Sequence, residues 1–189
     1  STAAAAAAAT AAKRGRDPAL ANPCSAFDFA ASLRTASSPL ARKLAADALG
    51  ELLLDNSSEV DMKLGIAALT AALAEDTHGK VRKHCAWALA KAWPACSANG
   101  ATPASLAPAL HQLAVVLVDD RNQRVRSHAA ETLGRLGADA APAVAALIVA
   151  LGDRSRRVRV RVAAALGMVG PAAHPAAKEL ASTCLGDSD

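Results

Sequence analysis

Apolar residues recur along most of the chain at intervals of three and four positions, which is the spacing of helices with one buried face. This pattern predicts helices over about 26–36, 59–75, 80–94, 142–151 and 175–185, and one more that begins at Pro39. In the helix that Pro39 opens, the expected buried positions are Leu40, Leu44, Ala48, Leu49 and Leu52. The chain is therefore expected to be all-α.

Local signals mark the ends of several of these helices. Ser25 and Asp28 have the spacing of a capping box, and Pro39 suits a first helical position, where a missing N–H costs nothing. Residues 56–58 are polar and predict the cap of the next helix, while residues 97–103 predict the longest loop. Helix packing and helix ends are the expected roles of four glycines, Gly134, Gly137, Gly167 and Gly170.

One phrase repeats. Residues 125–134 read VRSHAAETLG, residues 158–167 read VRVRVAAALG, and an earlier copy at 81–90 reads VRKHCAWALA. Five residues before each opening Val stands an acid: Asp76, Asp120 or Asp153. Self-similarity at such intervals indicates a solenoid of stacked helix pairs, and residues 25–189 have room for about four to five pairs.

The two ends of the chain differ in character. Residues 1–24 are rich in alanine and are expected to be a low-complexity tail or linker, with a transit-peptide remnant as the alternative. Residues 185–187 read LGD, as do residues 151–153 just before a Val-Arg helix. The repeat domain is therefore expected to be truncated at its C-terminal end, as a fragment of a longer array.

The amino-acid composition limits the classes of function that suit this chain. The chain is 52% hydrophobic, mostly through alanine, with two Trp, two Phe and no Tyr, which suits thin, closely packed helices better than base-stacking platforms. The net charge is +4, yet residues 121–161 hold nine Arg against three acids. No apolar run approaches the roughly 20 residues of a membrane span, so a soluble protein without membrane insertion is expected.

The four cysteines lie far apart, with no Cys-x-x-Cys pair, which indicates neither a zinc site nor a disulfide framework. Cys85 takes the place that Ala129 holds in the next copy, so we expect it to be a small buried residue. This cysteine usage favours a reducing, intracellular compartment, and leaves the cytoplasm and an organelle as alternatives.

The repeated phrase resembles HEAT repeats, in particular the short repeats also found in phycobilin lyase subunits and deoxyhypusine hydroxylase; the resemblance covers about 25–189. It implies a right-handed solenoid of antiparallel helix pairs. It also implies a structural ladder of an Asp that ends each first helix and an Arg that opens each second helix. The ladder maps onto Asp76 with Arg82, Asp120 with Arg126, and Asp153 with Arg159.

Deoxyhypusine hydroxylase tests whether the resemblance extends to enzyme activity, because that enzyme holds two irons with His-Glu pairs. The corresponding positions here are Lys83-His84, Ser127-His128 and Val160-Arg161, and the sequence contains no His-Glu. A metal shared by His84 and His128 is disfavoured, since no acid or Cys is in register to complete its shell. Nucleophile-elbow and phosphate-loop motifs are also missing from the sequence, so we expect no enzyme activity and no cofactor.

The resemblance places the second helices on the concave face, where one strip of side chains is the candidate partner-binding surface. Its residues are His84, Trp87, Lys91, His128, Glu131, Arg135 and Arg161. The same offsets in the helix that Pro39 opens give Leu44, Asp47 and Glu51, so the strip is acidic at that end. Trp is enriched among binding hot spots, yet Trp87 also suits a gap among alanines, and both readings stay open. The strip favours a non-enzymatic scaffold or structural subunit of a larger assembly that binds a protein partner.

Two other functions compete with the scaffold. A basic cluster of Arg154, Arg156, Arg157 and Arg161 suits phosphate binding, which makes a nucleic acid the alternative partner. The cluster also suits a solvated ridge or an acidic protein partner, which we favour because no aromatic residues are interleaved with the arginines. The third function, a chaperone-like bilin lyase subunit, is implied by the resemblance alone.

Overall fold

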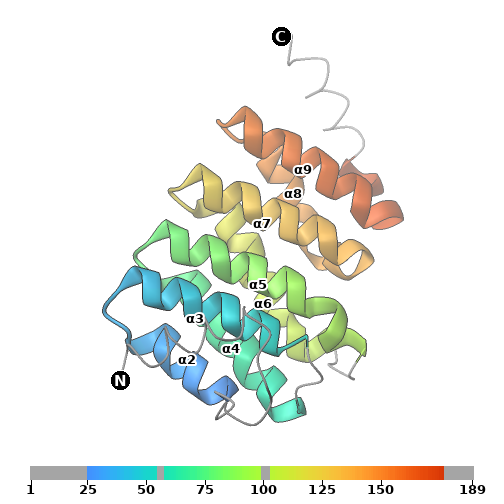
Figure 1. The fold of residues 1–189 in the computed structure, drawn as a ribbon. Helices are drawn as coiled ribbons and strands as arrows, with labels where there is room; N and C mark the ends of the chain where they lie inside the picture. Colours follow the sequence, from blue (N-terminus) through green and yellow to red (C-terminus); the bar gives the residue numbers. More distant parts are fainter. Residues whose placement is uncertain (1–24, 55–57, 99–102, 177–189) are drawn as a thin grey trace. The chain divides into compact units, whose positions relative to one another are not determined.

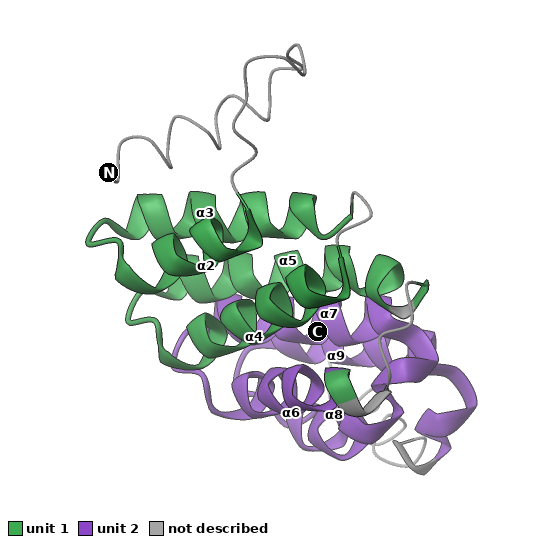
Figure 2. Ribbon diagram, turned by 90° about the horizontal axis from the view of Figure 1, so that it is seen from below, with its two compact units in different colours: residues 1–105 green, residues 106–189 purple. Residues whose placement is uncertain are grey.

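The computed structural model describes residues 25–54, 58–98 and 103–176, and these residues contain helices and turns but no strand, which confirms the all-α expectation. The chain divides into two compact units, Ser1–Ser105 and Leu106–Asp189, coloured separately in Figure 2. The first four helices are α2 (Ala26–Thr35), α3 (Pro39–Leu52), α4 (Glu59–Glu75) and α5 (Gly79–Ala98). The remaining elements are α6 (Pro103–Asp119), α7 (Gln123–Leu136), η1 (Gly137–Ala143), α8 (Val144–Ala150), α9 (Arg156–Val169) and η2 (Gly170–Ala176).

The first unit consists of two helix pairs in two layers. The first helices of the pairs, α2 and α4, pack on each other, and so do the second helices, α3 and α5, which lie side by side in Figure 1. The predicted caps are confirmed: Ser25 and Asp28 form a capping box, and Ser58 caps α4. Pro39 stands at the start of α3. Local sequence therefore sets where these helices begin.

The buried face of α3 differs from the expected one. Leu49 is buried, but Leu40 is 63% exposed, and Ala45, Ala46 and Gly50 are buried instead. The reason is a close approach between second helices: a Cβ placed on Gly50 would lie 2.9 Å from the Cβ of Ala88 on α5. Small residues allow the two backbones to meet there, so the larger leucines of α3 turn partly outward.

Helix α5 is longer than expected. The sequence predicts an end near residue 94, yet α5 continues through Pro94 to Ala98. Trp93 and Cys96 on either side of Pro94 are both buried. Packing of these side chains therefore offsets the cost of placing a proline within a helix.

The second unit repeats one helix ending. Helix α7 ends at Gly137 with φ +58°, and α9 ends at Gly170 with φ +77°, the left-handed region that favours glycine. A 3-10 segment follows in each case. The helix expected to open at Pro142 begins only at Val144, because Pro142, which has no N–H donor, is taken into η1. Most of the helix expected over 175–185 lies outside the described residues.

One stretch in the described chain, Gln123–Ala150, is long and apolar enough to cross a membrane by length and composition alone. The sequence pattern predicted no apolar run of that length. In the structure it consists of α7, η1 and α8, interrupted by the backbone reversal at Gly137. Leu133, Leu136 and Leu147 are buried within the protein. The buried core accounts for part of this hydropathy, and the stretch does not establish membrane insertion.

Candidate interaction surfaces

An arginine and an aspartate bridge successive repeats in each unit. In the first, Arg42 Nε lies 2.6 Å from Asp76 Oδ2 and Nη2 lies 3.2 Å from Oδ1. In the second, Arg126 makes the same two contacts with Asp153, at 2.7 and 2.9 Å. Paired, charge-assisted hydrogen bonds of this kind are among the strongest polar contacts in proteins. They tie each second helix to the first helix of the next repeat.

The implied ladder is therefore shifted by one repeat. Arg82, Arg126 and Arg159 each follow an aspartate in their own repeat, as the resemblance implies. Their Nη1 groups donate to the backbone oxygens of Asp76, Asp120 and Asp153 respectively, at 2.7 to 3.0 Å. The carboxylates of Asp76 and Asp153 instead bind the arginine of the preceding repeat. The guanidinium of Arg126 spans both acceptors, so it closes its own turn and ties the next repeat.

Arg42 is the bridge residue that the sequence analysis missed. It opens α3 within an Ala-Arg rather than a Val-Arg pair. One signal identifies it: Gly50 follows Arg42 by eight residues, as Gly134 follows Arg126. The eight-residue spacing to a glycine therefore identifies Arg42, whereas the repeated Val-Arg phrase does not.

Ionisation is shifted in both bridges. Burial would raise the pKa of Asp76 and of Asp153, but hydrogen bonds from Arg42 and Arg126, together with backbone N–H groups, outweigh it and lower both pKa values. The same hydrogen bonds raise the pKa of each arginine above its ordinary value. The bridges are thus fully charged at neutral pH, and they are structural.

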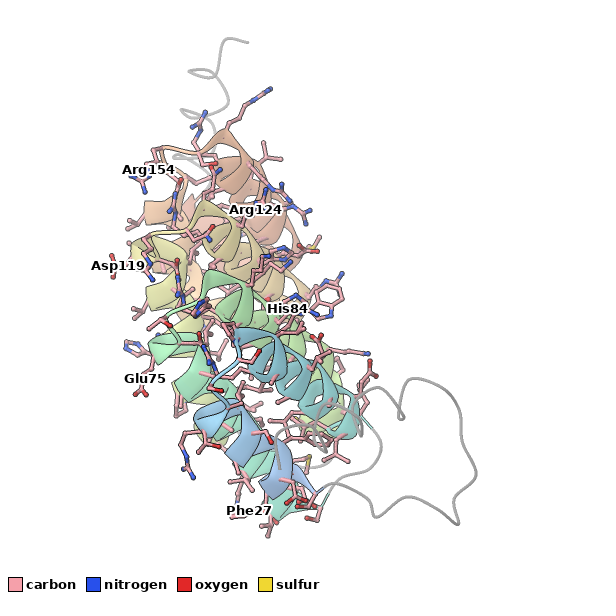
Figure 3. All side chains as sticks on the ribbon, turned by 60° about the vertical axis from the view of Figure 1, so that its left-hand side comes forward. Phe27, Glu75, His84, Asp119, Arg124 and Arg154 are labelled. Carbon is pink, nitrogen blue, oxygen red and sulfur yellow. The ribbon has the colours of Figure 1, made fainter. Side chains whose placement is uncertain are left out.

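The strip residues of the first unit form one patch on α3 and α5, which we call the Trp87 patch: Asp47, Glu51, His84, Trp87 and Lys91. His84 Nδ1 lies 2.7 Å from Asp47 Oδ1, and Lys91 is paired with Glu51. Trp87 lies between His84 and Lys91 along α5 and remains 38% exposed. Figure 3 labels His84 on this surface. The structure thus brings these strip residues together and shows that Asp47 and Glu51 hold His84 and Lys91.

Asp47 is the electrostatic centre of the Trp87 patch. Its partial burial would raise its pKa, but the hydrogen bonds and charges of His84 and Lys43 lower the pKa below the ordinary aspartate value. Lys43 Nζ lies 3.1 Å from Asp47 Oδ2 on the same helix. The carboxylate is therefore ionised and holds His84 in place.

In the second unit the strip residues gather around Glu131, and we call His128, Glu131, Arg135 and Arg161 the Glu131 cluster. Arg161 Nη1 of α9 lies 2.8 Å from Glu131 Oε2 of α7. His128 Nδ1 and Arg135 Nη2 each lie 3.5 Å from a Glu131 oxygen. One acid thus organises three basic side chains and links the two second helices of this unit.

The predicted phosphate-binding cluster is divided between two settings. Arg154, Arg156 and Arg157 are exposed at the start of α9 and at the turn before it, where Figure 3 labels Arg154. Arg161 instead pairs with Glu131. The first turn of α9 holds no acidic residue, so positive side chains gather at a helix N-terminus that is already electropositive.

Metal binding and cysteine reactivity are two further kinds of chemistry to consider for the described residues. Within them, no three His, Cys, Asp or Glu side chains come close enough together to hold a metal ion. Cys85 is fully buried, and burial raises the pKa of its thiol well above the ordinary value, as do Asp76 and Asp47. A thiol of that kind is a packing residue rather than a nucleophile.

Comparison with known proteins gives one match. A family model of HEAT repeats matches residues 66–143 and again residues 108–189. Searches of curated proteins and of solved structures found no match. HEAT repeats generally mediate protein–protein interactions as scaffolds, and proteins built from them are typically not enzymes.

Proposed function

Since this chain belongs to the HEAT repeat family, whose model matches more than half of its length, we propose that it is a non-enzymatic scaffold that binds a protein partner through its second helices. The Trp87 patch is the principal contact. The Glu131 cluster, with His128, Arg135 and Arg161, adds a polar contact on the second unit.

The observation that carries the proposal is the exposed indole of Trp87. At the equivalent positions, α3 has Asp47 and α7 has Glu131, and both acids pair with a base on the next second helix. Trp87 replaces such an acid with a large side chain that remains 38% exposed. Tryptophan at the centre of a patch is the residue type most enriched among binding hot spots.

The ion pairs around Trp87 support this role. His84 and Lys91, on either side of the indole, are held by Asp47 and Glu51 across the helix contact. Side chains that are already ordered lose less conformational entropy when a partner binds. We therefore assign His84 and Lys91 to orientation and polar contact at the edge of the patch, and Trp87 to affinity.

The test is quantitative affinity capture from a native cell extract, with nuclease added to one half of each sample. The intact chain is compared with Trp87→Ala and with Phe27→Ala, a matched control that removes an exposed aromatic side chain from α2. A partner that resists nuclease, disappears with Trp87→Ala and persists with Phe27→Ala supports the proposal. Circular dichroism of each variant verifies that the helices are retained.

Two outcomes would overturn the proposal. Partners retained by Trp87→Ala would place binding elsewhere, and lost helical signal in Trp87→Ala would make the indole a packing residue. Nuclease-sensitive capture that is lost with Arg156→Glu/Arg157→Glu would favour nucleic acid. The exposed arginines of α9 motivate that second function, which also predicts affinity that falls steeply with salt.

A further inference from the structure

Helix α9 has an outward face that is apolar and exposed. Val160 is 59% exposed and Met168 60%, and Ala164 and Gly167 between them are also exposed. We call these four residues the α9 face. They recur at intervals of three and four, so they lie on one side of the helix.

Two of the corresponding positions on α7 are buried where α7 packs against α9. Ser127 corresponds to Val160 and is only 2% exposed, and Gly134 corresponds to Gly167 and is buried. A Cβ on Gly134 would lie 2.9 Å from Ala165 Cα of α9, whereas a Cβ on Gly167 would meet nothing within 4 Å. In Figure 1, α7 and α9 run side by side. The α9 face therefore has the form of a helix-docking surface and stands open in the described part of the chain.

The first unit uses the same contact independently. Gly50 of α3, in register with Gly134, receives Ala88 of α5, and a Cβ on Gly50 would lie 2.9 Å from that methyl group. Two of the three second helices with glycine at this position therefore receive another helix through a small side chain. The third is α9.

The residues of the α9 face are less polar than those at the corresponding positions of α3 and α7. Val160 stands where α3 has Lys43 and α7 has Ser127, and Met168 stands where α7 has Arg135. The exposed Val160 and Met168 indicate a surface suited to burial against another helix, since burying apolar area is favourable and exposing it is not.

Charge determines which helix fits. In the first unit the receiving helix supplies acids, Asp47 and Glu51, to the bases of α5; in the second, Glu131 of α7 receives Arg161. Helix α9 has Ala164 at the position of Glu131, contains no acid, and exposes Arg156 and Arg157. The charge on the receiving helix is therefore positive on α9, whereas α3 and α7 supply acids, so an incoming helix must supply the carboxylates.

We propose that the α9 face binds an acidic amphipathic α-helix of a partner protein, with a small residue packed at Gly167 and carboxylates directed to Arg157 and Arg161. A second copy of α9 offers no carboxylate, because Arg156–Val169 contains none. A nucleic acid would leave Val160 and Met168 without an apolar partner. This surface is separate from the Trp87 patch, and its existence does not depend on binding there.

The probe is a labelled peptide with the sequence of residues 156–169 in which Glu replaces the four arginines, stapled on its outer side to keep it helical. Its control is the same stapled peptide with the arginines retained, which has the same apolar face and the opposite charge. Fluorescence anisotropy with the full chain should give affinity at least about tenfold higher for the acidic peptide. Added salt should reduce this difference.

Variants of the chain locate the site. Gly167→Leu fills the open space and Met168→Glu places a negative charge on the face, and each should weaken acidic-peptide binding about tenfold or more. One control should leave binding unchanged: Ala71→Leu, at an exposed position on α4. Unchanged thermal unfolding of both face variants verifies that they remain folded.

Three outcomes would overturn the inference. Equal affinity of the acidic and basic peptides would remove the charge argument. Acidic-peptide binding that survives both Gly167→Leu and Met168→Glu would place the contact elsewhere. Self-association of the chain that disappears with Gly167→Leu would show that a second copy, rather than an acidic helix, occupies the face.

Discussion

The contact between α3 and α5 and the contact between α7 and α9 share a buried arrangement but differ at the surface. In each, glycine meets alanine where the helices approach most closely, and an Arg–Asp bridge ties the repeats. At the surface, the first contact pairs Asp47 with His84 and Glu51 with Lys91. The second directs three bases to Glu131 alone. Repeat geometry is thus conserved between the two contacts, whereas the surface that meets partners varies.

The two bridges also differ in burial. The side chains of Arg126 and Asp153 are 3% and 8% exposed, and those of Arg42 and Asp76 are 13% and 5% exposed. An ion pair that is screened from water on both sides is more costly to break by removing one partner. The second unit should therefore depend more on its bridge than the first.

The largest expected effect comes from Arg126→Met. Removing the guanidinium leaves Asp153 charged and buried, which should cost about 3–4 kcal/mol of unfolding free energy. Arg42→Met, the matched change in the more exposed bridge, should cost about 2 kcal/mol. Urea unfolding followed by circular dichroism measures both, and equal losses would contradict the difference in burial.

The next effect tests the close approach of helices. Gly134→Leu would force a side chain against the backbone of Ala165 and should destabilise the fold by about 2–3 kcal/mol. Gly167→Leu, the same substitution at the equivalent open position on α9, should change stability by less than about 0.5 kcal/mol. Thermal unfolding of the pair is the measurement. A similar loss in both variants would mean that the α9 face is already covered.

Acidification should have a smaller effect than removing either arginine, because a protonated aspartate still accepts a hydrogen bond. The pKa values of Asp76 and Asp153 are lowered in the folded chain. Their contribution is therefore complete above the ordinary aspartate pKa of about 3.9 and is lost as pH falls through the lowered values. Urea midpoints at neutral and acid pH should show this loss, and Asp153→Asn should reduce it.

The smallest effect concerns the surface pairs. A double-mutant cycle on Glu131 and Arg161 should give a coupling of about 1 kcal/mol, because Glu131 is mostly buried. The cycle on Glu51 and Lys91, where the acid is largely exposed, should give about 0.3 kcal/mol. Chemical unfolding of the four proteins in each cycle supplies the values. Equal couplings would show that gathering bases around one acid adds no stability.

The sequence predicted much of the local structure but less of the packing. Capping at Ser25 and Ser58 was predicted because these signals lie within a few residues of the helices they start. The continuation of α5 through Pro94 was not predicted, since the buried side chains of Trp93 and Cys96 decide it. For the interaction surfaces, the repeat register gave His84, Trp87 and Glu131. It also placed Asp47 and Glu51 on the strip, but it did not give their ion pairs with His84 and Lys91.

By itself, the sequence determined the helices, their repetition and the family, because hydrophobic spacing, caps and the Val-Arg phrase are local properties of the chain. Only the tertiary structure decided which partners these residues have. It pairs Asp76 with Arg42 and Asp153 with Arg126 rather than with the arginines of their own repeats. Among the described residues, it also leaves the α9 face open. Such pairings depend on how closely two backbones approach, a distance that glycine and alanine set only when the helices pack together.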